Sequence, residues 1–319
     1  MKRIITFLLI GFIFNVQAQT DSVLIKQVER LRVTKNYSQI IDALSKVNGK
    51  GDIWVNYQLA CYYSLLNDGG NSFNHLQTSI NLGAKGEDIL TDTDFDNMHS
   101  TEKWYLIVDT LEQIYLAKYP NIASKELAIE LWHVYIEDQR FRTLNKNYKK
   151  PFPKFGTPEH HDFNKIQGKK VDVIRKRLIK IIKVQGWPTY SMVGTEAADG
   201  VFYVFQHSGY KYLKKYLPYL KEAAMSGEAS KANYAKMYDR FEMNSGRKQY
   251  YGTQIVSSGK FDKDGNYIKG IWQFHPIQDF EKVNERRSEM DLPPIEEYAK
   301  RMNVVYNPDA NIALRKFKH

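Results

Sequence analysis

The chain has 319 residues, and its 46 Lys and Arg against 36 Asp and Glu give a formal net charge of +10 at pH 7. This length allows two modest hydrophobic cores. The single cysteine, Cys61, excludes an intramolecular disulfide, and its apolar surroundings indicate a small buried side chain rather than a reactive thiol.

The N-terminus has the pattern of a signal peptide. Two basic residues precede an apolar run over residues 4–16, and Val16-Gln17-Ala18 matches a small-x-small cleavage site. We therefore expect residues 1–18 to be removed and the protein to be exported, either to the periplasm or out of the cell. No later stretch approaches the roughly twenty apolar residues of a transmembrane helix, so none is expected after cleavage.

Residues 19–121 have the apolar spacing of paired helices. The clearest pair is separated by the polar turn Asn67-Asp68-Gly69-Gly70 and closes on Gly83. This pair resembles a degenerate tetratricopeptide repeat, in which Ala60 is the small residue that lets two helices approach. One such repeat cannot bury its own faces, so neighbouring helices are expected to cover it.

Residues 122–305 are predicted to form a second, mainly helical domain, followed by a tail over residues 306–319. Its first helix, from Lys125 to about Asn145, has an apolar stripe that ends at Tyr135. Continuing the helical step leads to polar residues, namely Asp138, Gln139 and Arg142. An Asp138–Arg142 ion pair at a domain edge and the wall of a polar pocket explain this pattern equally well.

Residues 149–164 are predicted to be a loop. The sequence Glu159-His160-His161-Asp162 has metal-ligand residue types, but adjacent histidine side chains diverge and no partner cluster has metal-site spacing. No metal site is predicted here.

Residues 169–183 are predicted to form a basic amphipathic helix, since seven Lys and Arg surround an apolar stripe. We favour a core-packed helix with a solvated outer face, and the alternatives are contact with anionic lipid headgroups, an acidic glycan or nucleic acid.

Two further helices carry polar residues beside apolar stripes. Gln206 and His207 lie next to the stripe of the helix over residues 195–208, and Asp239 and Arg240 lie on the helix over residues 230–244. Because a partly buried histidine is the most useful general base near neutral pH, we consider His207 oriented by Asp239 as a catalytic pair. A structural ion pair between the two helices is the alternative.

A β-hairpin is predicted over about residues 250–275. Residues 250–256 and 267–274 alternate like strands, and an Asp-Gly turn separates them. Gly252 permits another backbone or a ligand to come close, and Gln254 offers both a donor and an acceptor. Helices are expected over residues 276–287 and 292–301.

The C-terminal motifs, taken in order, resemble the bacterial domain of unknown function 6624 family. The resemblance extends from about Lys125 to Tyr298 and implies a mostly helical domain with a shared polar site, but no activity. The motifs that carry it are Asp138-Gln139-x-x-Arg142, Gly186-Trp187-Pro188, Gln206-His207, Asp239-Arg240, Gly246-x-x-Gln249-x-Tyr251-Gly252-Thr253-Gln254, Pro276-x-x-Asp279 and Arg286-Arg287.

Two classes of function fit these residues. In the first, the C-terminal domain binds a small anionic or glycan-like ligand in a polar pocket, and the N-terminal helices bind a protein partner. In the second, the domain is a metal-independent, hydrolase-like enzyme that uses His207 and Asp239. No cofactor motif is present, and the expected export argues against nucleic acid as a partner. The expected ligand-binding residues are Asp138, Gln139, Arg142, Trp187, Gln206, Arg240, Tyr251 and Gln254.

Overall fold

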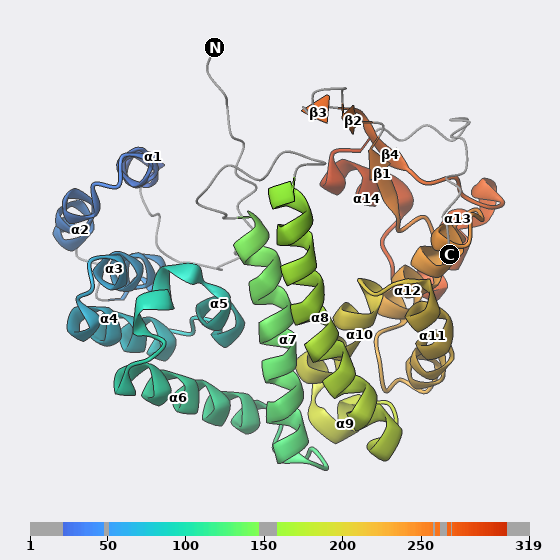
Figure 1. Cartoon of the computed structure of the whole chain (residues 1–319), viewed down its shortest axis with the longest axis horizontal. Coiled ribbons are helices and arrows are strands. Elements are labelled where there is room, and N and C mark those ends of the chain that lie inside the picture. Colours follow the sequence, from blue (N-terminus) through green and yellow to red (C-terminus); the bar gives the residue numbers. More distant parts are fainter. Residues whose placement is uncertain are drawn as a thin grey trace. The chain divides into compact units, whose positions relative to one another are not determined.

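The computed structural model is mainly α-helical and describes residues 22–47, 51–146, 158–257, 259–261, 267–268 and 270–304; among these, the side chains of residues 141–146, 158–164, 166–167, 260–261 and 267–268 are not described. The expected signal peptide and tail therefore lie outside the described residues. The chain divides into two compact units, Met1–Leu111 and Glu112–His319 (Figure 1). Among the described residues, no helix is both long and apolar enough to span a bilayer.

The first unit is built from short helices that pack in sequence order. The helices and the 3₁₀ helix η1 are α1 (Ser22–Val33), α2 (Tyr37–Lys46), α3 (Ile53–Leu65), α4 (Gly69–Asn81), α5 (Gly86–Thr91), η1 (Thr93–Met98) and the first part of α6 (Glu102–Lys118). Asp52 caps α3 and Asp68 caps α4 through their side-chain oxygens. The predicted helical hairpin is present as α3 and α4, and the Ser72 hydroxyl donates to the Ala60 carbonyl oxygen at 2.8 Å. Ala60 therefore marks a close approach of these helices.

The division between the two compact units falls inside α6, after Leu111. Tyr115, in the last turns of α6, stacks on Trp132 and donates a hydrogen bond to the Val193 carbonyl oxygen at 2.7 Å. This end of α6 therefore belongs to the second core.

After the end of α6, the second unit contains eight α-helices, four short strands and one 3₁₀ helix among its described residues. They are α7 (Lys125–Lys146), α8 (Pro158–Gln185), α9 (Tyr190–Val193), α10 (Thr195–Gln206), α11 (Tyr210–Met225), α12 (Lys231–Asn244), β1 (Ile255–Ser257), β2 (Lys260–Phe261), β3 (Tyr267–Ile268), β4 (Trp272–Phe274), η2 (Phe280–Lys282), α13 (Val283–Glu289) and α14 (Ile295–Met302). The helix α10 is buried almost throughout, because its apolar residues face neighbouring helices on several sides.

The predicted hairpin is present in two antiparallel pairs. Strand β1 pairs with β4 in the register Ile255↔Phe274, and β2 pairs with β3 in the register Lys260↔Ile268. The predicted turn lies outside the described residues. Residues 250–254, expected to begin the strand, instead form a loop, and the helix expected from residue 276 begins only at η2 and α13.

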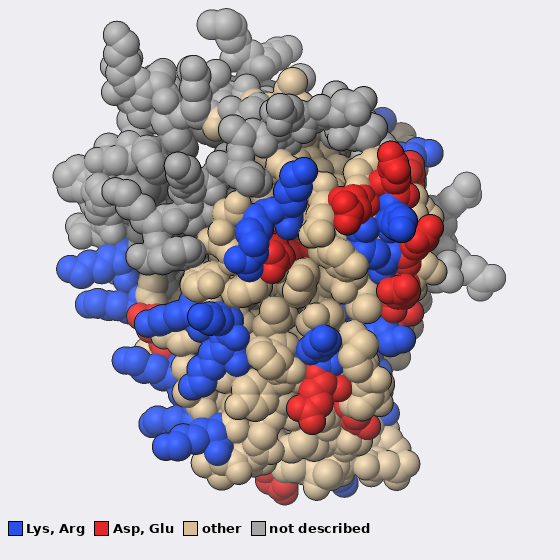
Figure 2. Space-filling view, turned by 90° about the vertical axis from the view of Figure 1, so that its right-hand side faces the viewer, with Lys and Arg blue, Asp and Glu red and all other residues tan. Residues whose placement is uncertain are grey.

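The helix α8 begins at Pro158, inside the segment expected to be a loop. Its predicted amphipathic character is confirmed, because Ile174, Leu178 and Ile182 are buried while most of its lysines are exposed. Figure 2 shows Lys and Arg side chains gathered along the left of one face, whereas acidic and basic side chains alternate on its right.

Candidate functional site

Asp239 is fully buried in the middle of α12 and holds the loop over residues 249–254, named here the 249–254 loop. Its Oδ1 accepts from the backbone N–H groups of Tyr250 at 2.7 Å and Tyr251 at 2.9 Å. Its Oδ2 accepts from the backbone N–H and the hydroxyl of Thr253, at 2.9 and 2.8 Å. Burial raises the pKa of Asp239 to about 6, while these four hydrogen bonds oppose the shift. The carboxylate is therefore a backbone anchor.

The prediction that Asp239 orients His207 is wrong. His207 is exposed at the C-terminal end of α10, and all hydrogen bonds of the Asp239 carboxylate go to the 249–254 loop. The N–H groups of a loop lack the partners that regular secondary structure supplies, so a buried carboxylate that accepts from three of them is not available to orient an imidazole.

Two arginines hold the opposite side of the same loop. Arg286 donates to the Tyr250 carbonyl oxygen at 2.9 Å, and Arg287 donates to those of Tyr251 at 2.8 Å and Gly252 at 3.1 Å. Both guanidinium groups are buried, and their remaining hydrogen bonds go to carbonyl oxygens of α13's flanking segments. The Arg286-Arg287 motif is therefore structural.

Gln249 and Gly252 complete this arrangement. The Gln249 amide accepts from the Gln254 N–H at 2.7 Å and donates to the carbonyl oxygens of Gln254 and His275 at 3.0 and 2.6 Å. Gly252 has φ +69°, and a Cβ there would lie 2.6 Å from Ile295 Cδ1. The close approach predicted at Gly252 is thus made by the protein's own core.

The helices α7 and α10 run in the same direction. Both begin at one place, where the Ser124 N–H donates to the Met192 carbonyl oxygen at 3.1 Å, and further along Tyr135 and Tyr203 pack with ring centroids 5.7 Å apart. Asp138 and Gln206 each lie one turn beyond these tyrosines. The predicted polar residues of the two helices therefore share one end of this helix pair.

The helix α12 brings a third group to this end. The Lys236 carbonyl oxygen accepts from Gln206 Nε2 at 3.3 Å and from Gln254 Nε2 at 3.1 Å. Arg240 lies one turn further along α12. The structure thus brings Gln206 and Gln254 together, beside the helix turn that carries Arg240.

The other sequence-predicted residues are placed as follows. Asp138 is buried and accepts from Gln139 Nε2 at 3.1 Å, whereas the side chain of Arg142 lies outside the described residues. Trp187 is a core residue packed against Phe205, and Tyr251 belongs to the loop that Asp239 anchors.

Sequence reasoning missed a hydrogen-bonded chain between α10 and α12. Asp199 Oδ1 accepts from the Tyr190 hydroxyl at 3.1 Å and from Asn233 Nδ2 at 3.0 Å, and Asn233 Oδ1 accepts from Lys236 Nζ at 3.2 Å. Burial raises the pKa of Asp199 and lowers the pKa of Lys236. The signal in the sequence is a polar stripe at helical spacing on each helix. We name this set the α10–α12 seam: Asp199, Gln206, Asn233, Lys236 and Arg240.

One acceptor in the seam is buried without a partner. Gln206 is only 7% exposed, and no donor among the described residues reaches its Oε1 atom. Leaving such an atom unsatisfied costs about 1–3 kcal/mol.

One cluster of side chains with metal-ligand residue types contacts other side chains of the protein. In the described part of the chain, Cys61, Asp92 and Asp94 in the first unit have ligand atoms within 4.8 Å of one another. Arg32 pairs with Asp94 at 2.8 Å, the Tyr57 hydroxyl donates to Asp92 at 2.9 Å, and burial raises the pKa of the Cys61 thiol. These residues therefore fit an ion-pair network and not a metal. The side chains of Glu159-His160-His161-Asp162 lie outside the described residues.

Residues 159–310 match a family of unknown function (DUF6624). The C-terminal resemblance is therefore confirmed. The DUF6624 match contains α10, α12, the 249–254 loop and both arginines, but it begins after Asp138, Gln139 and Arg142. No curated protein and no solved structure matches the chain.

Proposed function

We propose that the second unit binds a small anionic, hydroxyl-bearing ligand of the glycan type at the α10–α12 seam. The observation that carries this proposal is the buried Gln206 Oε1 atom, which no donor among the described residues reaches. A ligand hydroxyl donates to this atom and recovers the free energy that its burial costs.

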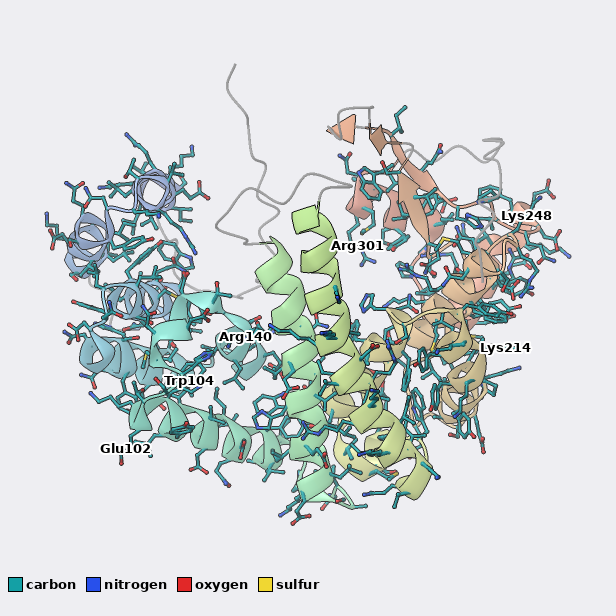
Figure 3. All side chains as sticks on the ribbon, in the orientation of Figure 1. Glu102, Trp104, Arg140, Lys214, Lys248 and Arg301 are labelled. Atoms are coloured by element: carbon teal, nitrogen blue, oxygen red, sulfur yellow. The ribbon has the colours of Figure 1, made fainter. Side chains whose placement is uncertain are left out.

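The charges around the seam favour an anion. Lys236 Nζ donates to the neutral Asn233 amide, and no carboxylate among the described residues lies within 4.0 Å of it. Burial lowers the pKa of Lys236, the Asp199 carboxylate opposes this shift, and Arg301, labelled in Figure 3, adds to it. Arg240 is on the same helix face. A carboxylate or phosphate group bound here would pair with the Lys236 ammonium group.

The test is ligand-dependent thermal stability of the chain that lacks residues 1–18. Because we also propose export, the panel contains sugar phosphates, uronic acids and muropeptides. A ligand at one hundred times its Kd stabilises the folded protein by about 2.7 kcal/mol. Gln206→Met keeps the side-chain volume but removes both the acceptor and the hydrogen bond to the Lys236 carbonyl oxygen, so we expect Kd to rise about tenfold. Lys214→Met, on the exposed face of α11, is expected to leave Kd unchanged. If no class stabilises the protein, or if Gln206→Met binds as the parent does, the proposal fails.

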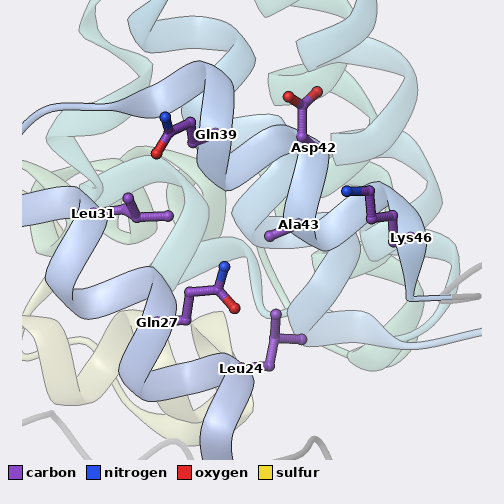
Figure 4. Close-up of a pocket in the computed structure, with 7 residues that line it drawn as sticks. All are labelled: Leu24, Gln27, Leu31, Gln39, Asp42, Ala43 and Lys46. Atoms are coloured by element: carbon purple, nitrogen blue, oxygen red, sulfur yellow. The ribbon is translucent and has the colours of Figure 1, made fainter.

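We further propose that the N-terminal helices bind a protein partner. Between α1 and α2 lies a groove of about 380 Å³, whose lining side chains come from both helices (Figure 4). The apolar residues Leu24, Leu31 and Ala43 line it together with two glutamines, Asp42 and Lys46, a mixture suited to a peptide segment. A photocrosslinker at Gln39 is expected to capture a defined partner, and one at Glu29, which does not line the groove, is not. Equal capture at both positions would argue against the groove.

A further inference from the structure

Five exposed lysines lie on one line along the outer surface of α8. At about 100° per residue, they fall within about 60° of one another and extend over roughly 27 Å of the helix. The buried residues Ile174, Leu178 and Ile182 lie on the opposite side. We name these five the lysine stripe: Lys165, Lys169, Lys176, Lys180 and Lys183.

The lysine stripe carries charge that the described part of the chain does not balance. None of its members forms an ion pair with another described residue, and the nearby Asp172 pairs with Arg175. The helix places Lys165 beside Lys169 and Lys176 beside Lys180 at four-residue spacing, where like charges destabilise a helix. A surface that only solvates a helix usually alternates acidic and basic residues at this spacing. An anionic partner would relieve this repulsion.

Two exposed valines lie on one edge of the stripe. Val173 is 68% exposed and Val184 is 82% exposed, and their spacing of three turns places them on nearly the same line. A hydrated, soluble polyanion offers no apolar contact to these side chains, whereas the headgroup layer of a bilayer accepts both lysine and apolar side chains. The apolar face of α8 is buried in the protein, so contact with a bilayer would be peripheral.

We propose that the lysine stripe holds the protein against an anionic bilayer surface, with Val173 and Val184 entering the headgroup layer. Each lysine near such a surface raises the affinity roughly fivefold. The attraction is screened by salt, because the charges are exposed. This surface is independent of the α10–α12 seam and does not require that the seam bind a ligand.

The test is cosedimentation of the chain lacking residues 1–18 with vesicles of phosphatidylglycerol and phosphatidylcholine, and with vesicles of phosphatidylcholine alone. The variant Lys169→Gln, Lys176→Gln, Lys180→Gln is expected to lose about a hundredfold in affinity for the anionic vesicles. Its control is Lys214→Gln, Lys221→Gln, Lys248→Gln, which removes the same charge from other exposed positions (Lys214 and Lys248 are labelled in Figure 3). We expect the control to bind as the parent does. Equal losses in both variants, or equal binding to neutral vesicles, would overturn the proposal.

A second variant separates a bilayer from a soluble polyanion. Val173→Ser with Val184→Ser is expected to weaken vesicle binding several-fold and to leave heparin binding unchanged, since only the bilayer contacts the valines. Binding to heparin without binding to anionic vesicles would assign the stripe to a soluble polyanion and overturn the proposal. Circular dichroism of each variant confirms that these exposed substitutions leave the fold intact.

Discussion

At the scale of single residues, the polar positions divide into those that hold the backbone and those whose hydrogen-bonding groups are not all used. Asp239, Arg286 and Arg287 place their hydrogen bonds on the 249–254 loop. Gln206 has an acceptor left over. Helical spacing in the sequence predicts that Asp239 is buried, and it is. The spacing does not predict its partners, because these belong to a loop that follows α12 and has no periodic pattern.

Replacing Asp239 with Asn tests the anchoring role. An amide fits the same space but presents an NH₂ group to N–H donors of the 249–254 loop, so two donors lose their acceptor. We expect Asp239→Asn to lower the free energy of unfolding by about 2–4 kcal/mol, measured by urea denaturation at pH 7.

Asp291→Asn is the matched control, since Asp291 is exposed with φ +53° and asparagine tolerates that conformation. An Asp239→Asn protein as stable as this control would show that the carboxylate does not hold the loop.

At the scale of elements, helices with strong apolar periodicity are predicted correctly and segments held by side chains are not. The predicted helices over residues 125–145, 195–208 and 230–244 are present within a few residues. Residues 250–254 alternate like a strand, yet buried side chains satisfy their backbone groups and keep them out of the sheet. Residues 276–279 begin with a proline, which favours a helix start, but the Gln249 N–H donates to the Pro276 carbonyl oxygen and Asp279 has a left-handed backbone, so the helix begins later.

At Gly252, both the backbone conformation and the neighbouring core oppose an added side chain. Alanine there meets Ile295 and Ile277 side-chain atoms at 2.6 and 3.0 Å and must also adopt a positive φ. We expect Gly252→Ala to destabilise the protein by about 2–4 kcal/mol, from backbone strain and overpacking together.

Gly227→Ala isolates the backbone contribution, since Gly227 has φ +80° and nothing lies near its Cβ position. We expect this control to cost only about 1–2 kcal/mol in the same denaturation experiment. Equal losses for the two variants would mean that the core yields at Ile295 and that the close approach is not tight.

At the scale of the whole molecule, two compact units are present, and the sequence indicates both a helical first region and a helical second one. The order of the C-terminal motifs was sufficient to find the family. The candidate site was harder to predict, because its residues come from α10, α12 and the 249–254 loop, and only packing decides which polar groups are satisfied. Asp199 and Lys236 were not predicted for this reason. In the sequence each has the pattern of an ordinary surface residue, and only the packing of α10 against α12 buries it.

The 249–254 loop lies between a buried carboxylate that precedes it and two buried guanidinium groups that follow it in the chain. If the segment with Asp239 were present without the segment with Arg286 and Arg287, its buried charge would have no opposite charge nearby, and the reverse also holds. A gene rearrangement that joins or separates sequences anywhere between residues 254 and 286 would leave one half buried without its compensating charge. In evolution, the segment from residue 239 to residue 287 is therefore expected to be inherited, duplicated or fused only as one piece.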